Sequence, residues 1–447
     1  MGTSNLKILI LSDGWPPQSK GGAETIAHGL AGAYAASGHQ VQVVTTVRQV
    51  SKTNDGCEDE DGLAIVPIVS DYPKLLRPYL GLRNPAPSAA VAAAVRRFEP
   101  DVVHAHNVHR YLSYDALRRC RQAGAPVLLT LHDAMSVDYG RFTQGVRPEY
   151  RPGQAMDYRV RLLPTLCRYH VQYFPLRNAF IRRYLHTCTD ARYTVSAALA
   201  EFLGTNGVRV DGHVHTGTDP DRFNTAEGPA VGLRERMGLG GRSLIALSGR
   251  LTEEKGSLAA LHMLEGIRKG GHDAVLVALG GSPGDCPAFD TLHQQLGLSE
   301  AVAYTGWLTD AALVEACQAC DLFLVPSICL DAFPTVVLEA MACARPVIAT
   351  CFGGASEAVQ DGVTGYIANP YDTHRWVEHA SALLSDGNLA RQMGERGRER
   401  VRREFSMARC ASRYLDLLEE LTLDPGRNHT MGQRPESAQQ DRPNDAA

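Results

Sequence analysis

Short, continuous apolar runs alternate with longer segments whose apolar residues recur at helical spacing, and this alternation covers most of the chain. Helical periodicity is seen, for example, at 23–38 and 197–203. The apolar runs of the first half lie at 7–11, 41–46, 100–106, 125–133 and 191–196. Such runs between helices are typical of buried parallel strands covered by helices on both faces. The pattern therefore predicts a doubly wound α/β domain.

A second series of the same kind begins after a polar, glycine-rich stretch at 224–241. Its apolar runs lie at 243–249, 274–281, 302–307, 321–327, 346–350 and 365–368. A chain of 447 residues is longer than an ordinary domain of roughly 100–250 residues. We therefore predict two Rossmann-like domains, at 1–220 and 221–424, that face each other across a cleft. The tail at 425–447 lacks apolar periodicity and is predicted to be disordered.

The composition is that of a soluble globular enzyme. Apolar residues make up 44% and charged residues 21%, and 45 basic against 49 acidic side chains give a net charge of −4. No apolar run approaches the roughly 20 residues needed to cross a bilayer, and the first residues lack the features of an export signal. We therefore expect a cytoplasmic protein without a nucleic-acid partner, whose eleven cysteines are reduced.

Two clusters in the sequence raise metal or redox chemistry. Cys317 and Cys320 have the spacing of a redox pair or half a zinc site, but no second pair matches them and their segment resembles a buried helix face. His104, His106 and His109 follow a predicted strand, where active-site residues are common, yet no set of cysteines or carboxylates nearby completes a metal site. We therefore interpret both clusters without a metal.

The segment at 141–186 departs from the balanced charge of the rest of the chain. It contains nine arginines and two acids, a local balance of nine minus two, or +7, interleaved with tyrosine and phenylalanine. One interpretation is a pair of solvated helices on the first domain. The other is a surface that contacts anionic lipid headgroups or a phosphorylated acceptor, because arginine and aromatic side chains together suit a membrane interface.

Several positions at the expected cleft suit a phosphate group. The dinucleotide fingerprint GxGxxG is absent after the first strand, which counts against a nicotinamide enzyme. Instead, Gly21 and Gly22 stand at a predicted helix start, where backbone N–H groups can approach an anion. In the second domain, Arg250 and Lys255 follow the first strand, and a forked guanidinium beside a flexible ammonium suits a diphosphate. Each signal alone also fits an ordinary turn or loop.

The stretch DAFPTVVLEA combines two carboxylates with a helix start. Pro334 suits the first helical position, so the amides of Thr335 and Val336 are expected to be free to face an anion. Asp331 precedes the helix and Glu339 lies about one and a half turns inside it, so the two acids can hold different parts of an elongated ligand. A phosphate at the helix start, with hydroxyls bound by the flanking acids, describes a nucleotide-sugar.

These motifs together resemble those of the family-4 retaining glycosyltransferases of the GT-B fold. The resemblance extends from about residue 7 to about residue 405 and rests on GGAE, LHD, SGRLTEEKG, DAFPTVVLEAMACARPVIA and GGASEAVQDGVTGYI. The family implies two Rossmann-like domains and a nucleoside-diphosphate sugar, such as a UDP-sugar, as the donor. It also implies transfer of a hexose to an acceptor hydroxyl with retention at the anomeric carbon, without a cofactor or metal.

The resemblance carries roles over to matching positions. Glu339 matches the acid that binds the ribose hydroxyls of the donor. Asp331 takes the place of the acid that holds the transferred sugar, where the family normally has Glu, a difference that bears on donor choice and activity. Arg250 and Lys255 match the pair that binds the diphosphate. Gly22 matches the glycine whose backbone approaches the diphosphate from the other domain.

The remaining matches lie around the reacting sugar. Phe333, Pro334 and Thr335 match the turn under the donor, and Glu357 lies in a loop near the base. His132 matches the histidine that orients the sugar, with proton transfer by it as a second option. The acceptor hydroxyl is expected to attack from the side of the leaving diphosphate, which takes the acceptor proton while the cations stabilise its charge. The catalytic set assigned in this way comprises His132, Asp331 and Glu339.

Other functions stay open on the sequence. A glycoside hydrolase needs two carboxylates about 5–10 Å apart around one bond and no diphosphate clamp, which fits Asp331 and Glu339 poorly. A nucleotide-sugar epimerase, a sugar phosphorylase or a silent nucleotide-sugar binder shares the fold. The segment at 141–186 favours a lipid-linked acceptor in cell-envelope or exopolysaccharide assembly, with peripheral contact to an anionic membrane. A soluble natural-product aglycone is the alternative acceptor.

Overall fold

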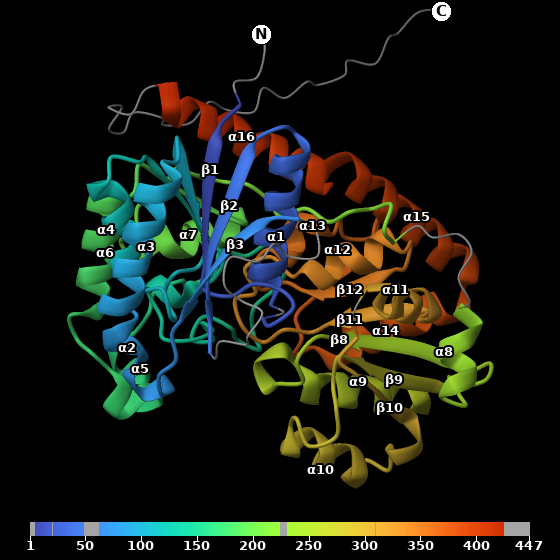
Figure 1. Cartoon of the computed structure of the whole chain (residues 1–447). Coiled ribbons are helices and arrows are strands. Elements are labelled where there is room, and N and C mark those ends of the chain that lie inside the picture. Colours follow the sequence, from blue (N-terminus) through green and yellow to red (C-terminus); the bar gives the residue numbers. More distant parts are fainter. Residues whose placement is uncertain (1–4, 20, 49–61, 224–229, 309, 424–447) are drawn as a thin grey trace, which may run out of the picture.

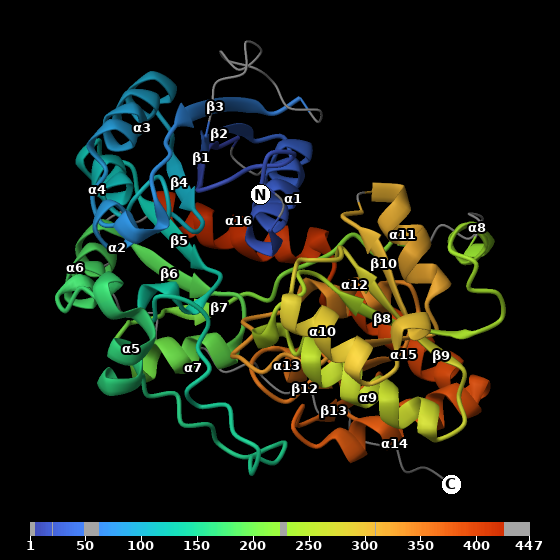
Figure 2. The ribbon, with the colours of Figure 1, turned by 90° about the horizontal axis from the view of Figure 1, so that it is seen from below.

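The computed structural model describes residues 5–19, 21–48, 62–223, 230–308 and 310–423. Each half of the chain forms a β-sheet covered by helices, and the two sheets belong to separate domains (Figure 1 and Figure 2). Within the described residues, every pair of neighbouring strands in the two sheets is parallel. This confirms the predicted fold of two doubly wound Rossmann-like domains. The predicted disordered tail lies outside the described residues.

The first domain is built on a seven-stranded sheet. Its strands are β1 (Lys7–Ser12), β2 (Gln40–Val47), β3 (Ala64–Val69), β4 (Val102–Ala105), β5 (Val127–Leu131), β6 (Ala191–Thr194) and β7 (Gly212–His213). Its helices are α1 (Gly22–Ala36), η1 (Lys74–Leu76), α2 (Arg77–Leu80), α3 (Pro85–Phe98), α4 (Asp115–Gln122), η2 (Ala134–Ser136), α5 (Leu162–Tyr169), η3 (His170–Gln172), α6 (Arg177–Cys188) and α7 (Ala197–Thr205).

The second domain is built on a six-stranded sheet. Its strands are β8 (Ser243–Ser248), β9 (Ala274–Leu279), β10 (Val302–Gly306), β11 (Leu322–Val325), β12 (Val347–Thr350) and β13 (Tyr366–Ala368). The helices from here to the end of the described chain are α8 (Ala230–Arg236), η4 (Glu253–Lys255), α9 (Ser257–Lys269), α10 (Pro287–Gln295), η5 (Ser299–Ala301), α11 (Asp310–Ala319), α12 (Thr335–Ala342), α13 (Ala355–Ala358), α14 (Thr373–Ser385), α15 (Gly387–Glu404) and α16 (Met407–Leu423).

Both sheets contain a point at which the strand order reverses. The order is β3-β2-β1-β4-β5-β6-β7 in the first sheet and β10-β9-β8-β11-β12-β13 in the second. In open parallel sheets, ligands bind beyond the carboxyl ends of the strands beside such a reversal. The segments that follow β1, β4 and β5 in the first domain, and β8 and β11 in the second, are therefore where a site is expected.

Strand β3 has no counterpart among the predicted runs. Its sequence AIVPIV contains Pro67, and a proline weakens the signal for a strand because it cannot donate to the ladder. The structure places β3 at the edge of the sheet, where β2 is its only partner among the described strands and Pro67 lies opposite Thr45. An edge position leaves one side of the strand without a partner, so the missing N–H is tolerated there.

The last helix, α16, returns to the first domain, although the predicted boundary assigned it to the second. Its buried residues Cys410, Tyr414 and Leu418 join an apolar cluster with residues of α1 and the first sheet. The chain crosses between the domains beside the linker, where Ser406 pairs with Thr218. The apolar face of α16 explains its position, because that face needs a partner and the first sheet supplies one.

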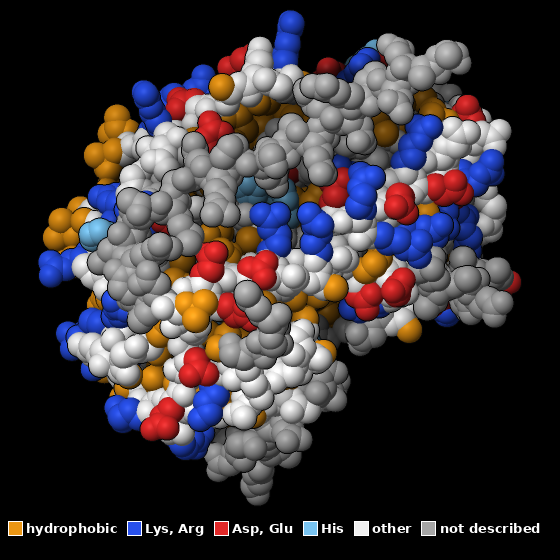
Figure 3. Space-filling view, turned by 90° about the horizontal axis from the view of Figure 1, so that it is seen from above, with side chains coloured by type: hydrophobic (Ala, Val, Ile, Leu, Met, Phe, Trp, Pro, Cys, Tyr) orange, Lys and Arg blue, Asp and Glu red, His pale blue; other side chains and the backbone are white. Residues whose placement is uncertain are grey.

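The surface around the two C-terminal helices carries acidic and basic side chains intermixed rather than a field of one sign (Figure 3). The ten cysteines of the described chain are all free thiols, and nine of them, including Cys317 and Cys320, are buried. Within the described residues, no helix combines the length and the apolar character that crossing a membrane requires.

Candidate active site

In the second domain, two residues predicted to bind different parts of the donor are joined to each other. The Nζ of Lys255 donates to Oδ2 of Asp331, and Oγ of Ser327 donates to the same oxygen at 3.0 Å. Burial alone raises the pKa of Asp331, but the charge and hydrogen bond of Lys255 outweigh it and hold that pKa below its usual value. Asp331 is therefore ionised at neutral pH.

The loop that carries Asp331 is held by the glycine pair of the GGASE motif. Gly353 has φ of +93°, and a Cβ on it would lie 2.1 Å from the carbonyl oxygen of Asp331, so no other residue fits there. The N–H of Gly354 donates to the same carbonyl oxygen at 2.9 Å. The motif thus fixes the backbone from which the Asp331 side chain reaches Lys255.

Helix α12 begins one residue later than predicted. Pro334 stands at the N-cap position with ψ of 110°, and Thr335 and Val336 are the first two helical residues. Their amides have no acceptor within the helix, as at any helix start. In the first domain, Gly22 begins α1, and a Cβ on Gly22 would lie 3.7 Å from Cγ2 of Thr335. Two helix N-termini, each carrying partial positive charge, therefore meet between the domains.

Glu339 lies on α12, four residues after Thr335, and is half-buried. Burial raises its pKa, while Arg222 and a hydrogen bond with Thr335 act in the opposite direction. The sequence motif thus places one acid before the helix start and one inside the helix, as predicted. Their roles in binding a donor stay predictions.

Arg250 lies where charges from both domains converge. Partial burial lowers the pKa of Arg250, and Arg141 and Arg110 of the first domain lower it further by repulsion. Arg141 crosses to the second domain, where Nη1 donates to Oγ1 of Thr252 at 3.3 Å. An arginine cluster with repulsion of this kind favours an anion between its members.

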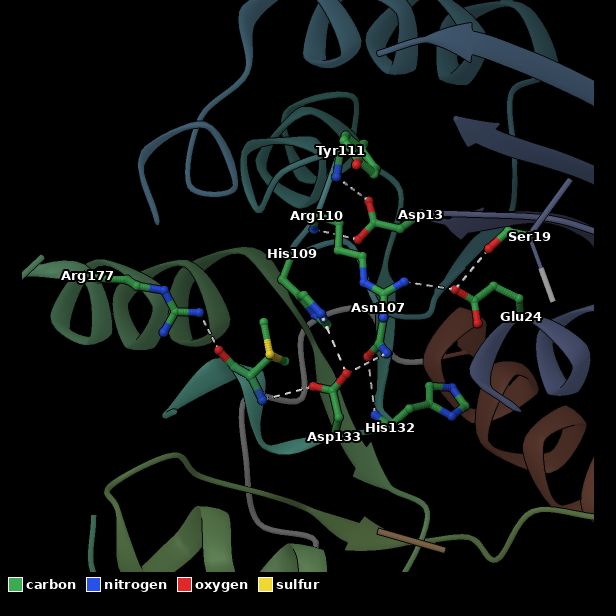
Figure 4. A network of polar contacts seen from close by, with 11 residues as sticks. Asp13, Ser19, Glu24, Asn107, His109, Arg110, Tyr111, His132, Asp133 and Arg177 are labelled. Atoms are coloured by element: carbon green, nitrogen blue, oxygen red, sulfur yellow. Dashed lines mark hydrogen bonds and ion pairs between the residues drawn. The ribbon is translucent and has the colours of Figure 1, made fainter. Parts of the chain in front are cut away.

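In the first domain, His132 stands directly after β5. The backbone N–H of His132 donates to Oδ1 of Asn107 at 3.3 Å, and the ring Nε2 of His132 lies 2.9 Å from Nδ1 of His106. Burial lowers the pKa of His132 to about 4 despite the opposing charge of Asp133. Figure 4 shows Asn107 between the backbone of His132 and the Asp133 side chain. His132 is therefore neutral at neutral pH.

A polar network that was not predicted from the sequence holds the loop after β4 (Figure 4). Asp13, which follows β1, accepts the backbone N–H of Arg110, Tyr111 and Leu112 at 2.6–2.8 Å. Burial raises the pKa of Asp13 to about 6, although these bonds oppose the shift. Arg110 in turn forms an ion pair of 3.3 Å with Glu24 of the GGAE motif. The sequence contained one signal for this network, namely the position of Asp13 directly after a strand.

Part of the basic segment at 141–186 joins the two domains. The carbonyl of Phe142 accepts the N–H of Leu330 at 2.8 Å, and Arg168 forms an ion pair of 3.2 Å with Glu254. Arg177 is buried within the first domain and lies over the ring of Tyr139. Neither interpretation of the segment predicted these contacts. They place a loop of the first domain beside the Asp331 loop.

Glu357 connects the domains at the linker. Its carboxylate accepts the N–H groups of Ala197 and Ala198 at the start of α7, both at 2.9 Å, and binds His215 Nε2 at 2.7 Å. Burial raises the pKa of Glu357, but these bonds outweigh it and lower the pKa below its usual value. The ring of Phe333 packs against that of His215 in a tilted arrangement, with ring centroids 5.0 Å apart. Both residues were predicted beside the donor, and the structure shows them in an interdomain contact.

Two of the three histidines considered as metal ligands, His104 and His106, are hydrogen-bonded to protein groups. His104 lies 3.1 Å from the Tyr34 hydroxyl and 2.8 Å from Thr130 Oγ1, and His109 lies 3.5 Å from Asp133. A different group, His213, His215 and Glu357, offers ligand atoms within 4.8 Å of one another, and no other such group occurs in the described chain. The hydrogen bonds of Glu357 with His215 and with the start of α7 already explain why these three residues lie close together.

Two family models match the chain in succession. "Glycosyltransferase Family 4" matches residues 20–222, and "Glycosyl transferases group 1" matches residues 234–400. A D-inositol 3-phosphate glycosyltransferase of Mycobacterium sp. (strain KMS) is 36% identical over 317 residues, 67% of this chain and 63% of the relative. A GDP-mannose-dependent alpha-(1-6)-phosphatidylinositol monomannoside mannosyltransferase of Mycolicibacterium smegmatis is 29% identical over 54% of this chain and 61% of the relative. The chain thus spans about three-fifths of the length of these relatives.

Solved structures share the fold over nearly the whole chain. Sucrose-phosphate synthase from Thermosynechococcus elongatus has a TM-score of 0.72 at 21% identity, covering 94% of this chain and 99% of that chain. Anabaena HepE in complex with UDP-glucose has a TM-score of 0.71 at 19% identity, covering 93% of this chain and 100% of that chain. At such identities the likeness shows the two-domain fold.

Proposed function

Because the chain belongs to the family-4 glycosyltransferases of the GT-B fold, we propose that it transfers a hexose from a nucleoside-diphosphate donor, of the UDP-sugar class, to an acceptor hydroxyl with retention of anomeric configuration. The observation that carries this proposal is the meeting of two helix starts, at Gly22 and Thr335, between the domains. The second domain adds two cations, Arg250, which feels the charges of Arg110 and Arg141 of the first domain, and Lys255, which is bonded to Asp331. Helix starts and fixed cations suit a diphosphate.

The chemistry follows from where negative charge develops. As the bond between the anomeric carbon and the phosphate oxygen breaks, the leaving diphosphate gains charge, and Arg250, Lys255 and the amides of Thr335 and Val336 stabilise it. The acceptor hydroxyl attacks from the same face, and its proton passes to the leaving phosphate oxygen. Fixed cations of this kind supply the stabilisation that a metal ion gives in other transferases.

The two acids hold the donor on either side of its diphosphate. Asp331 binds the transferred sugar and Glu339 binds the ribose, as the resemblance implies. Because Asp331 is ionised and bonded to Lys255, it suits neither the proton-donating acid of a hydrolase nor a free nucleophile. A sugar epimerase, a phosphorylase and a silent binder remain alternatives that only turnover separates.

A donor panel tests the proposal. The protein is mixed with UDP-, GDP-, ADP- and dTDP-sugars, and thermal shift and release of free sugar are measured, with ¹H NMR to identify the anomer that forms first. We expect one nucleotide class to raise the melting temperature, and Glu339→Ala to remove that shift. Release of the anomer opposite to that of the donor contradicts a retaining mechanism. Binding without turnover leaves the silent binder as the function.

Removal of divalent metal is expected to leave donor turnover unchanged within about twofold. The reason is that Arg250 and Lys255 provide the positive charge at the diphosphate. Turnover is measured after dialysis against EDTA, then again after addition of Mg²⁺ or Mn²⁺. Loss of turnover that the added metal restores would show that the cations alone do not suffice, and the catalytic scheme above would then be wrong.

We further propose that the acceptor belongs to cell-envelope or exopolysaccharide assembly and that the first domain contacts an anionic membrane. Seven of the twelve large apolar side chains that are exposed in the described chain gather on η1, α2, α5 and the start of α6. This apolar patch comprises Leu75, Leu76, Tyr79, Leu162, Leu163, Leu176 and Phe180. The rings of Tyr79 and Phe180 flank Phe174, with centroids 5.2 and 6.2 Å away.

Exposed basic side chains occur on the elements that carry the apolar patch. Lys74, Arg83, Arg159, Arg182 and Arg183 are exposed on the same elements or beside them. Helices α2, α5 and α6 lie on one side of the first domain in both ribbon views (Figure 1 and Figure 2). Exposed apolar groups together with cations suit the headgroup region of an anionic bilayer. A soluble natural-product aglycone is the alternative acceptor, and it requires no such surface.

Liposome flotation is expected to show binding to vesicles with 30% phosphatidylglycerol in phosphatidylcholine, roughly tenfold stronger than to phosphatidylcholine alone and weaker at high salt. Leu162 and Leu163 are 58% and 74% exposed, and the double variant Leu162→Glu, Leu163→Glu is expected to abolish binding. Val363→Glu, at a residue 43% exposed in the second domain, is the matched control. Equal binding by both variants would remove the patch from the proposal.

A further inference from the structure

A buried histidine lies behind the histidine of the candidate site. His104 and His106 are two residues apart, one at the end of β4 and one directly after it, and both are fully buried. The Nδ1 of His106 lies 2.9 Å from Nε2 of His132. Asn107 fixes the backbone of His132 at the same place. The ring of His132 is thus held from the interior of the first domain by one hydrogen bond.

The two rings share a single proton between these nitrogens. Burial lowers the pKa of His132 to about 4 and lowers that of His106 well below its usual value, with neighbouring histidines adding to the shift of His106. Both imidazoles are therefore neutral at pH 7. In a neutral imidazole one nitrogen donates and the other accepts, so the hydrogen bond has one donor, and the choice of donor sets both tautomers.

The far nitrogen of His106 decides which ring donates. Nε2 of His106 is buried and has no hydrogen-bond partner among the described residues. If the proton were on that nitrogen, a buried N–H would have no acceptor, and buried N–H groups without partners are rarer in proteins than buried acceptors without partners. The proton of His106 therefore belongs on Nδ1, from which it is donated to Nε2 of His132.

We infer that His106 is a positioning residue that fixes His132 as the tautomer with its proton on Nδ1. That nitrogen has no partner among the described residues, and His132 is half-buried at the carboxyl end of β5. His132 thus offers an N–H donor, and no lone pair, through the ring nitrogen that does not contact His106. Resting on the proposed function, this makes His132 a hydrogen-bond donor to a sugar oxygen, and it assigns the proton of the attacking hydroxyl to the leaving phosphate.

The tautomer is measured directly by long-range ¹H–¹⁵N NMR on protein with ¹⁵N-labelled histidine, assigned by comparison with His132→Asn. We expect Nδ1 of His132 to show the shift of a protonated nitrogen and Nε2 that of an unprotonated one, from pH 6 to 8. His106→Asn, whose amide N–H can replace the donor, is expected to keep this pattern. His106→Phe, which keeps a ring without a donor, is expected to lose it.

Donor turnover separates this inference from the proposed function. We expect His106→Phe to lower turnover roughly tenfold, the worth of about one oriented hydrogen bond, and His106→Asn to recover most of it. A wild-type His132 protonated on Nε2 would overturn the inference, whatever the activity. Full turnover by His106→Phe would overturn the positioning role and leave the proposed function intact. Absence of turnover with every donor would count against the proposed function, while the NMR result still decides the tautomer.

Discussion

Replacing Lys255 by alanine is expected to lower the kcat for donor turnover by about 10²–10³, the usual effect of removing one group that stabilises charge in the transition state. Lys255 has 27% of its side chain exposed, so its charge is only partly screened by solvent. The measurement is steady-state release of sugar from the donor that the panel identifies. A thermal shift with the corresponding nucleoside diphosphate reports the loss of binding.

The substitution also changes Asp331, which loses its charge partner while 88% of its side chain stays covered. Some loss of thermal stability is therefore expected, because removing one member of a buried ion pair leaves the other uncompensated. Lys255→Arg keeps the charge and controls for this loss. Lys269→Ala, on α9 with 72% of the side chain exposed and paired to Glu265, is the matched surface control. Unchanged turnover in a folded Lys255→Ala protein would remove Lys255 from the diphosphate site.

The fold was predictable because most of the parallel strands are continuous apolar runs, a signal that needs no tertiary information. Strand β3 shows one limit of that signal. Pro67 interrupts the run of β3, and only the edge position in the finished sheet makes the strand acceptable. Helix α16 shows another limit of prediction from sequence. Its apolar face is evident from the sequence, but the sequence does not indicate which of the two sheets that face covers.

The candidate site was predictable where motifs coincide with strand ends and helix starts. Gly22 and Thr335 were assigned separately to the diphosphate, and the structure brings them together. The tertiary contacts of the assigned residues were not predictable, either within the second domain or across the two domains. Lys255 and Asp331 were assigned to different parts of one ligand, and nothing in their spacing of 76 residues indicates an ion pair. Arg141 likewise gave no local signal, since its contact with Thr252 exists only when the domains meet.

Asp331→Asn is expected to lower kcat about 10²-fold while leaving the fold intact, because it removes the charge that orients Lys255 and that is proposed to hold the sugar, but preserves side-chain shape. The structure gives the physical reason: Lys255 and Ser327 both donate to the Oδ2 of Asp331. Asp331→Glu, which restores the acid usual in the family, is expected to retain turnover and to change the preferred sugar. Asp273→Asn, at an exposed carboxylate that pairs with Arg242 and Arg268, is the control.

The pH dependence of stability gives a second measure of Asp331. Because its pKa is lower in the folded protein than the unfolded value of about 3.9, the pair with Lys255 stabilises the fold above that value, and this stability is lost as the pH falls through the folded pKa. The melting temperature of wild type is therefore expected to exceed that of Asp331→Asn by a constant amount from pH 8 to about 5, and the difference should shrink below about pH 4. A difference that instead grows on acidification would mean that Asp331 is protonated in the folded protein, and the argument against its acting as an acid would fail with it.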